Sequence, residues 1–221
     1  RDRSPSRGLG DVYKRQGDEF VHVRRGAANV ANITVGDFYA KTTWGKDDYG
    51  VSILQVNEGG TINFNADKAV FDGSTNVAGG VFGSGSWGTL NITANELSID
   101  GNICGTYGTL TGSQHADTAF DLHITAGNLV MAGDINAGSM GDGYSKHDRT
   151  TNIAVNVTDT AELTGDIDVY ERGNIAISSD TMNWEGSATV NKGTLDISKV
   201  NNLTLTGVIV DADKALSLIH I

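Results

Sequence analysis

Apolar and polar residues alternate with a period of two along most of the chain, which is typical of β-strands, whose successive side chains point to opposite faces. One pattern occurs six times: two alternating apolar residues, a polar turn, two more alternating apolar residues, and then Gly-x-apolar. Because the same pattern recurs, the sequence predicts stacked repeats. The six copies are TINFNADKAVFDGST, TLNITANELSIDGNI, DLHITAGNLVMAGDI, NIAVNVTDTAELTGDI, NIAISSDTMNWEGSA and TLDISKVNNLTLTGVI.

In every copy a glycine follows the second pair of alternating apolar residues. Successive glycines are 28, 32, 32, 21 and 21 residues apart, so the bare repeat is about 21 residues and the first three intervals carry insertions of 7, 11 and 11 residues. Glycine adopts positive φ and permits close backbone approach, so we expect it at a corner of the repeat. These glycines are Gly73, Gly101, Gly133, Gly165, Gly186 and Gly207.

Each repeat is predicted to contain three short strands: one before the polar turn, one after it, and one after the glycine. A repeat buries about six apolar side chains at roughly 1.5–3 kcal/mol each. The backbone entropy of some 21 residues, about 1–2 kcal/mol each, outweighs that gain, so a repeat needs neighbours. A β-sandwich also has short alternating strands, but it does not predict the 21-residue recurrence. The sequence therefore predicts an all-β fold, a single-stranded parallel β-helix (β-solenoid) with a basic rung of about 21 residues and loop insertions.

The two ends differ from the rest of the chain. Residues 1–16 contain the only proline and five of the sixteen Lys and Arg. Within them DVYKRQ resembles the translation of a transposon-based sequencing-adapter end, and LSLIHI at residues 216–221 resembles the translation of its reverse complement. We therefore expect both ends to be adapter-derived, and the parent protein to be longer. Between them, residues 17–60 are predicted to form irregular N-terminal rungs of open register, and residues 61–215 regular rungs.

Charge and composition exclude several functions. Without the two end segments the chain has 11 basic and 25 acidic residues, a net charge of −14 instead of the −11 of the whole sequence. Phosphate backbones need a basic surface, so no nucleic-acid partner is expected. No stretch approaches the roughly 20 apolar residues of a membrane-spanning helix. Cys104 is the only cysteine, which excludes an internal disulfide, and the sequence predicts neither a cofactor nor a metal.

Three carboxylates form the sharpest candidate for catalysis. Asp134 and Asp166 occupy the same position in consecutive repeats, and Asp168 follows two residues later. Stacked positions are about 4.8 Å apart, close to the roughly 5–5.5 Å between the carboxyl groups of a retaining glycosidase. Three carboxylates could also bind calcium. Since acidic residues are frequent throughout this chain, a structural role on a solvated face is the favoured interpretation.

The three insertions are the candidate binding surface. They read VAGGVFGSGSWG, CGTYGTLTGSQHADTA and AGSMGDGYSKHDRTT. We expect them to follow the same part of the rung and to emerge on one flank, where Trp87, Tyr107 and Tyr144 could stack on sugars. The alternative, which we favour, is that these rings only cover the edges of the rungs.

The repeats, most clearly TLNITANELSIDGNI and TLDISKVNNLTLTGVIV, resemble the β-helical passenger regions of bacterial autotransporters and related secreted adhesins. The resemblance covers roughly residues 60–210. It implies export to the cell surface or beyond, with the parent protein attached to the outer membrane. It also implies a structural or adhesive role, with a polysaccharide or a host surface as the possible ligand of the lateral loops.

A fragment of a β-helical polysaccharide lyase or glycoside hydrolase is the alternative, because the same fold serves such enzymes. A lyase needs a basic residue to abstract a proton, and no Lys or Arg recurs beside Asp134 and Asp166. This favours a protein that is not an enzyme. In either case, open rung ends predict self-association of the chain.

Overall fold

The described residues of the computed structural model are all β and contain no helix that could cross a membrane. They are residues 13–16, 21–23, 29–41, 53–56, 59–73, 82–84, 87–104, 119–138 and 150–211. Their strands are β1 (Tyr13–Gln16), β2 (Val21–Val23), β3 (Val30–Lys41), β4 (Leu54–Val56), β5 (Gly60–Asp72), β6 (Phe82–Ser84), β7 (Gly88–Asp100), β8 (Ile103–Cys104), β9 (Ala119–Ala132), β10 (Ile135–Ala137), β11 (Thr150–Val157), β12 (Thr160–Thr164), β13 (Ile167–Val169), β14 (Gly173–Glu185), β15 (Ala188–Val190), β16 (Thr194–Thr206) and β17 (Ile209–Asp211).

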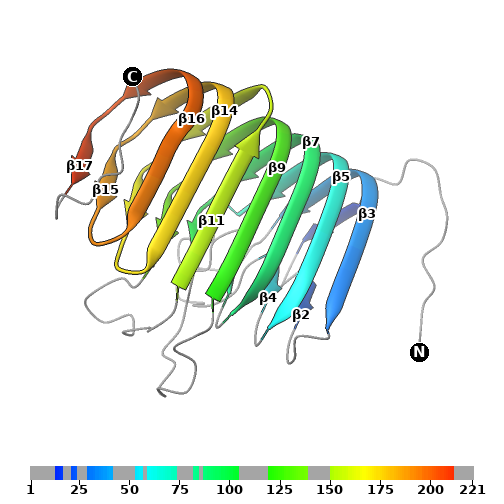
Figure 1. The fold of residues 1–221 in the computed structure, drawn as a ribbon. Coiled ribbons are helices and arrows are strands. Elements are labelled where there is room, and N and C mark those ends of the chain that lie inside the picture. The colour runs from blue at the N-terminus through cyan, green and yellow to red at the C-terminus, as the bar shows by residue number, and fades with distance from the viewer. Residues whose placement is uncertain are drawn as a thin grey trace, which may run out of the picture.

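These strands form two parallel sheets (Figure 1). The long strands make a nine-stranded sheet, in which β11 and β12 together occupy the place of one long strand. The short strands make an eight-stranded sheet in the order β17, β15, β13, β10, β8, β6, β4, β2. Long and short strands alternate in the sequence, so the chain crosses to the second sheet and returns once per repeat. Each strand pairs with its equivalents in the neighbouring repeats, and Figure 1 shows the resulting row of long strands from β3 to β16.

The prediction of three strands per repeat is wrong, because the first two form one long strand. β5 runs unbroken through the predicted polar turn, and its backbone pairs with β7 both before and after that turn. At the turn Asp67 and Lys68 both lie exposed. The chain therefore bends there without leaving the ladder, and only between β11 and β12 is the long strand interrupted.

The register before residue 60, which the sequence left open, is continuous with that of the later repeats. β3 pairs with β5 from Val30 opposite Thr61 to Lys41 opposite Asp72. β2 and β4 pair in the same way in the second sheet. The described strands before residue 60 thus follow the same pattern as the rest.

The inward-facing residues are those that the alternation predicts. Leu122 and Ile124 on β9 and Leu129 and Met131 further along it are buried, while His123 between the first two is exposed. The five short strands predicted to follow a glycine begin at the predicted residues, which are Ile103, Ile135, Ile167, Ala188 and Ile209.

An aromatic cluster fills the core near β3, β5 and β7. The ring centroids of Phe38, Phe64 and Phe71 lie 4.8, 5.1 and 5.4 Å apart. All three rings are buried. The pairs of Phe64 with Phe38 and with Phe71 are edge-to-face, and contacts of this kind add about 0.5–1.5 kcal/mol per pair to the burial itself.

Five of the six predicted corner glycines have the expected backbone angle, and four of them are shown to stack closely. Gly101, Gly133, Gly165, Gly186 and Gly207 have φ between +134° and +157°, which residues with a side chain rarely adopt. A Cβ on any of the last four would collide with the carbonyl oxygen of the corner glycine one repeat earlier. Glycine is thus required twice at this position, by its backbone angle and by the close approach.

The insertions do not all follow the same part of the repeat, so this prediction is wrong for the first of them. Residues 77–88 contain β6, which pairs with β4 and β8 as a regular short strand. The additional residues of that repeat precede its short strand, whereas residues 105–118 and 139–149 follow theirs. The glycine-rich sequence around Phe82 lacks an alternating pattern, and the strand is recognisable only from its neighbours.

Ser179 is a polar side chain in the core, and we predict that Ser179→Ala stabilises the protein. It is 4 % exposed and its hydroxyl oxygen has no hydrogen-bond partner. Two other repeats have alanine at the equivalent inward position, Ala94 and Ala126, both buried. A buried hydroxyl without a partner costs about 1–3 kcal/mol. Urea denaturation should show a gain of about 1 kcal/mol, and a loss of stability would mean that the hydroxyl has a partner in solution.

Candidate functional site

The predicted aspartates lie at the corner of the repeat, directly after the glycines. Asp134 and Asp166 immediately precede β10 and β13, and Asp168 is the central residue of β13. Ile135 pairs with Ile167, so the first two aspartates occupy equivalent positions in adjacent repeats, as the sequence predicts. Asp168 pairs with Asn136 on one side and Thr189 on the other.

Asp134 and Asp166 each hold the backbone of the following repeat. Oδ1 of Asp134 accepts a hydrogen bond from the backbone N–H of Asp166 at 2.9 Å, and Oδ1 of Asp166 accepts one from the N–H of Ser187 at 2.8 Å. Asn102 does the same for the N–H of Asp134, at 2.8 Å. These contacts form a corner ladder, by which we mean Asn102, Asp134, Asp166 and Ser187.

The corner ladder explains why an oxygen-bearing side chain follows Gly101, Gly133, Gly165 and Gly186. The glycine N–H bonds to the end of the next long strand, as from Gly133 to the carbonyl of Thr164, and Ile135 N–H bonds to the carbonyl of Asp166. The N–H of the residue after the glycine points back to the preceding repeat, where it donates to a side-chain oxygen. Leaving such a group unpaired would cost about 1–3 kcal/mol, so both carboxylates stabilise the stacking of the repeats at this corner.

Asp168 differs, because its carboxyl group is partly buried. Burial raises its pKa above the ordinary value of 3.8, and the carboxylates of Asp166 and Asp134 raise it further, while a hydrogen bond from Thr189 lowers it. The glycosidase hypothesis rests on the stacked pair Asp134 and Asp166, whereas the carboxyl group with the raised pKa is that of Asp168. Asp134 and Asp166, however, are already engaged with backbone N–H groups.

We predict that Asp168→Asn stabilises the protein at neutral pH. The folded state binds the Asp168 proton more tightly than the unfolded state, so the stability that this carboxyl contributes is present below pH 3.8 and is lost as the pH rises above it. Asparagine keeps an acceptor for Thr189 without the charge. Urea denaturation from pH 3 to 8 should therefore show an advantage of the variant that grows with pH, with exposed Asp37→Asn as the control. A variant less stable than the native chain at pH 7 would show that the charge is needed.

Neither metal binding nor proton abstraction finds support around these carboxylates. In the described part of the chain, no three His, Cys, Asp or Glu side chains are arranged to hold a metal ion, so the calcium hypothesis is not supported. Asp168 pairs with Asn136 and Thr189 across the strands, and Asn102 and Ser187 form hydrogen bonds with Asp134 and Asp166; none of the four is basic. A lyase would need a base at one of these positions.

Comparison with known proteins gives no family for this chain. No family model matches it, and neither the curated proteins nor the solved structures compared with it include a match.

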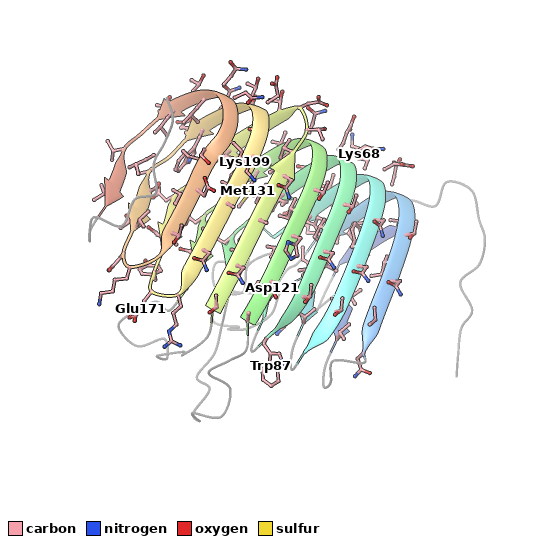
Figure 2. The ribbon with its side chains drawn as sticks, in the orientation of Figure 1. Lys68, Trp87, Asp121, Met131, Glu171 and Lys199 are labelled. Atoms are coloured by element: carbon pink, nitrogen blue, oxygen red, sulfur yellow. The ribbon has the colours of Figure 1, made fainter. Side chains whose placement is uncertain are left out.

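Of the three predicted aromatic binding residues, Trp87 is described. It directly precedes β7, and Figure 2 shows it at the rim where the long strands begin. Its side chain is half-buried, and its carbonyl accepts a hydrogen bond from Gly59 N–H at 3.0 Å. Tyr107 and Tyr144 lie outside the described residues, in the segments that join β8 to β9 and β10 to β11.

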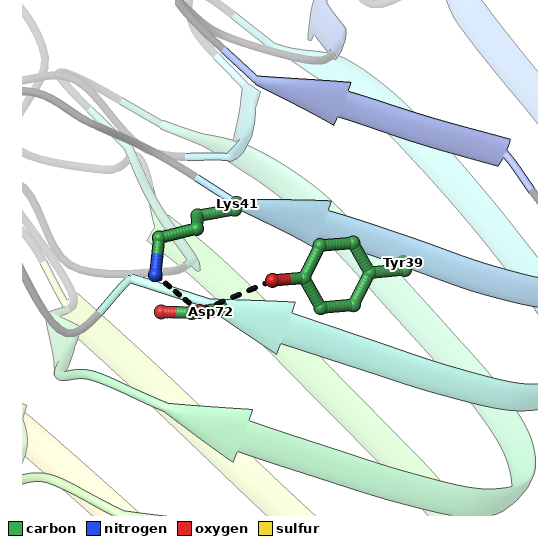
Figure 3. Close-up of polar contacts among 3 residues, drawn as sticks. All are labelled: Tyr39, Lys41 and Asp72. Atoms are coloured by element: carbon green, nitrogen blue, oxygen red, sulfur yellow. Dashed lines mark hydrogen bonds and ion pairs between the residues drawn. The ribbon is translucent and has the colours of Figure 1, made fainter.

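A polar cluster that sequence reasoning missed lies at the ends of β3 and β5 (Figure 3). Lys41 Nζ lies 2.7 Å from Oδ2 of Asp72, and the Tyr39 hydroxyl donates to the same oxygen at 3.3 Å. The hydrogen bond to Asp72 and the charge of that carboxylate raise the pKa of Lys41. A lysine held in its charged form is a poor general base, so this cluster joins two repeats and does not support proton abstraction. Tyr39 and Lys41 alternate on one face of β3, which the sequence shows. Asp72, however, is 31 residues from Lys41, and the contact can be predicted only once the pairing of β3 with β5 is known.

Proposed function

We propose that the chain is a single-stranded parallel β-helix and serves as a rod-like structural or adhesive segment of a secreted or surface-displayed bacterial protein, like an autotransporter passenger. The fold proposal is supported by the in-register parallel pairing of every repeat with the next, and by the return of the chain to the same sheet once per repeat. A coil of this kind gains stability with each repeat and suits a long, stiff spacer.

The observation that carries the structural role is that outward polar side chains bond from one repeat to the next. Asn63 Nδ2 donates to Asn32 Oδ1 at 2.8 Å, and Asn91 Nδ2 donates to Asn63 Oδ1 at 2.7 Å. A second ladder runs from Asn174 through Asn152 to Asp121, at 2.9 and 2.8 Å. With the corner ladder, these contacts occupy polar groups that a catalytic site would keep free for a substrate.

Adhesion is the more specific part of the proposal, and it assigns ligand contact to the rim that contains Trp87. A half-buried indole at the entry of a strand offers an apolar face of the kind on which sugar rings stack. The ligand class is a polysaccharide or a glycosylated host surface, met outside the bacterial cell.

The test is a binding assay with the whole chain immobilised on beads. Soluble neutral and acidic polysaccharides and cultured epithelial cells serve as ligands. We expect binding that Trp87→Ala weakens at least about fivefold and that Val130→Ala, an exposed apolar residue on β9, leaves unchanged. Binding that Trp87→Ala does not weaken would contradict ligand contact at this rim. Absence of binding to every ligand would contradict the adhesive role, and only the role as a spacer would remain.

The alternative of a polysaccharide-degrading enzyme rests on the equivalent positions of Asp134 and Asp166 in adjacent repeats, with Asp168 on the strand that follows. A reducing-end assay on the same polysaccharides tests it directly. Activity that disappears in Asp166→Asn but persists in Asp159→Asn, an exposed carboxylate between β11 and β12, would replace the structural proposal by the enzymatic one.

A further inference from the structure

Each repeat contributes one residue to the rim where the long strands begin. The pairing of the long strands places these residues in a single row, with neighbours about 4.8 Å apart. We call it the rim row, and its members are Gly59, Trp87, Ala119, Thr150, Arg172 and Lys192. Trp87, to which the adhesive proposal assigns ligand contact, therefore shares the rim row with two cationic residues. Figure 2 shows Trp87 and Glu171, the residue before Arg172, on this rim.

The backbone of the two cationic residues is in an unfavourable conformation. Arg172 and Lys192 are the only residues other than glycine with a positive φ in the described part of the chain, at 65° and 60°. Arg and Lys are not among the residue types that adopt this conformation more readily than others. Gly59, at the same position of another repeat, has φ 86°. Glycine would be the unstrained residue here, so the fold alone does not account for the two long side chains.

The rim row also differs in charge from the rest of the molecule. The chain has a net charge of −11, and its exposed strand residues Lys41 and Lys68 are each paired with a carboxylate one repeat later. Arg172 and Lys192 are both exposed, and Lys192 has no ion-pair partner among the described residues. Glu171 lies exposed beside Arg172, but the rim row itself contains no acidic residue. The positive charge is therefore concentrated at this part of the rim.

We infer that the rim row binds an acidic polysaccharide, an inference that rests on the proposed adhesive function and names its ligand class. The indole of Trp87 stacks on a sugar ring, while Arg172 and Lys192 pair with carboxylate groups further along the same glycan chain. Arg172 is three repeats from Trp87 and Lys192 is four, which corresponds to roughly 14 and 19 Å at about 4.8 Å per repeat. An extended chain of several sugar rings spans this distance, so a single ligand can contact all three residues.

The test compares polygalacturonate, a carboxylated polysaccharide, with its methyl ester, which keeps the sugar rings and lacks the charge. The whole chain should bind polygalacturonate at least about tenfold more tightly than the ester at low ionic strength. Added salt should reduce this difference, because it screens exposed charges. Combining Arg172→Gly with Lys192→Gly should abolish the preference, whereas Trp87→Ala should weaken the binding of both polymers.

Two further variants locate the charge that matters. Glu171→Gln removes the negative charge beside Arg172 and should strengthen the binding of polygalacturonate. Lys199→Gln is the matched control, because this lysine is also exposed but lies on β16 away from the rim (Figure 2). It should leave the binding of both polymers unchanged. An equal loss of binding in Lys199→Gln and in the double glycine variant would overturn the inference, since any lysine would then serve.

Stability separates ligand contact from a role in folding. Because glycine relieves the strained φ, the double glycine variant should unfold at the same urea concentration as the native chain or at a higher one. A lower midpoint, or a preference for polygalacturonate that persists in this variant, would overturn the inference. Equal binding of polygalacturonate and its ester that depends on Trp87 would overturn it as well but leave the adhesive proposal standing. Absence of binding to both polymers would also overturn it, and the wider set of ligands above then decides the adhesive proposal.

Discussion

Gly165→Ala is expected to destabilise the protein by about 3 kcal/mol or more. The glycine has φ +138°, and a Cβ there would collide with the carbonyl oxygen of Gly133. Neither backbone can retreat, because Gly133 N–H bonds to the carbonyl of Thr164 and Gly165 N–H to that of Glu185. Strained φ and steric overlap add together at this position. Urea denaturation followed by circular dichroism measures the loss.

Gly36→Ala is the matched control for that substitution. This glycine lies exposed on β3, and a Cβ there would meet nothing within 4 Å. Its replacement should change stability by no more than about 0.5–1 kcal/mol, in the stabilising direction if at all. Equal effects of the two substitutions would contradict the assignment of Gly165 to a close-packed corner.

The inward and outward faces of the strands could be predicted because the side-chain period of a strand is two. Leu122, His123 and Ile124 illustrate this: their alternation alone places the first and third in the core and the second in solvent, as found. The corner glycines could be predicted as well, since a positive φ restricts the choice of residue.

Continuity of the strands could not be predicted, because it depends on pairing between repeats. The polar residues at positions 67 and 68 read as a turn, yet the ladder from β5 to β7 holds on both sides of them. For the same reason β6 could not be predicted, because its three residues form a strand through pairing with β4 and β8.

The equivalent positions of the candidate aspartates could be predicted from the repeat, but the groups that they bind could not. Equivalent positions follow from the spacing of Asp134 and Asp166 alone. That each accepts a backbone N–H follows only from the direction in which that N–H points at the corner. Missing the contact between Lys41 and Asp72 has a similar cause, since the register of β3 was not legible in the sequence.

Trp184→Ala is expected to cost about 3–5 kcal/mol, because the indole is 2 % exposed and its removal leaves a cavity in the core. Trp184 Nε1 also donates to the carbonyl oxygen of Gly165 at 2.9 Å, which ties the core to the preceding corner. Trp184→Phe keeps much of the apolar volume but loses this bond, so an intermediate loss of about 1–2 kcal/mol should follow. Urea denaturation followed by circular dichroism measures the free energy of unfolding of the native chain and of both variants.

Val130→Ala is the surface control, at 54 % exposure, and should change stability by less than about 0.5 kcal/mol. Hydrogen exchange locates the damage of Trp184→Ala. Since each repeat contacts only its neighbours, protection should fall first in β12, β14 and β16, while β5 and β7 keep theirs. A uniform loss of protection from β3 to β16 would instead mean that the stack unfolds as one unit, and the nearest-neighbour account of its stability would then be wrong.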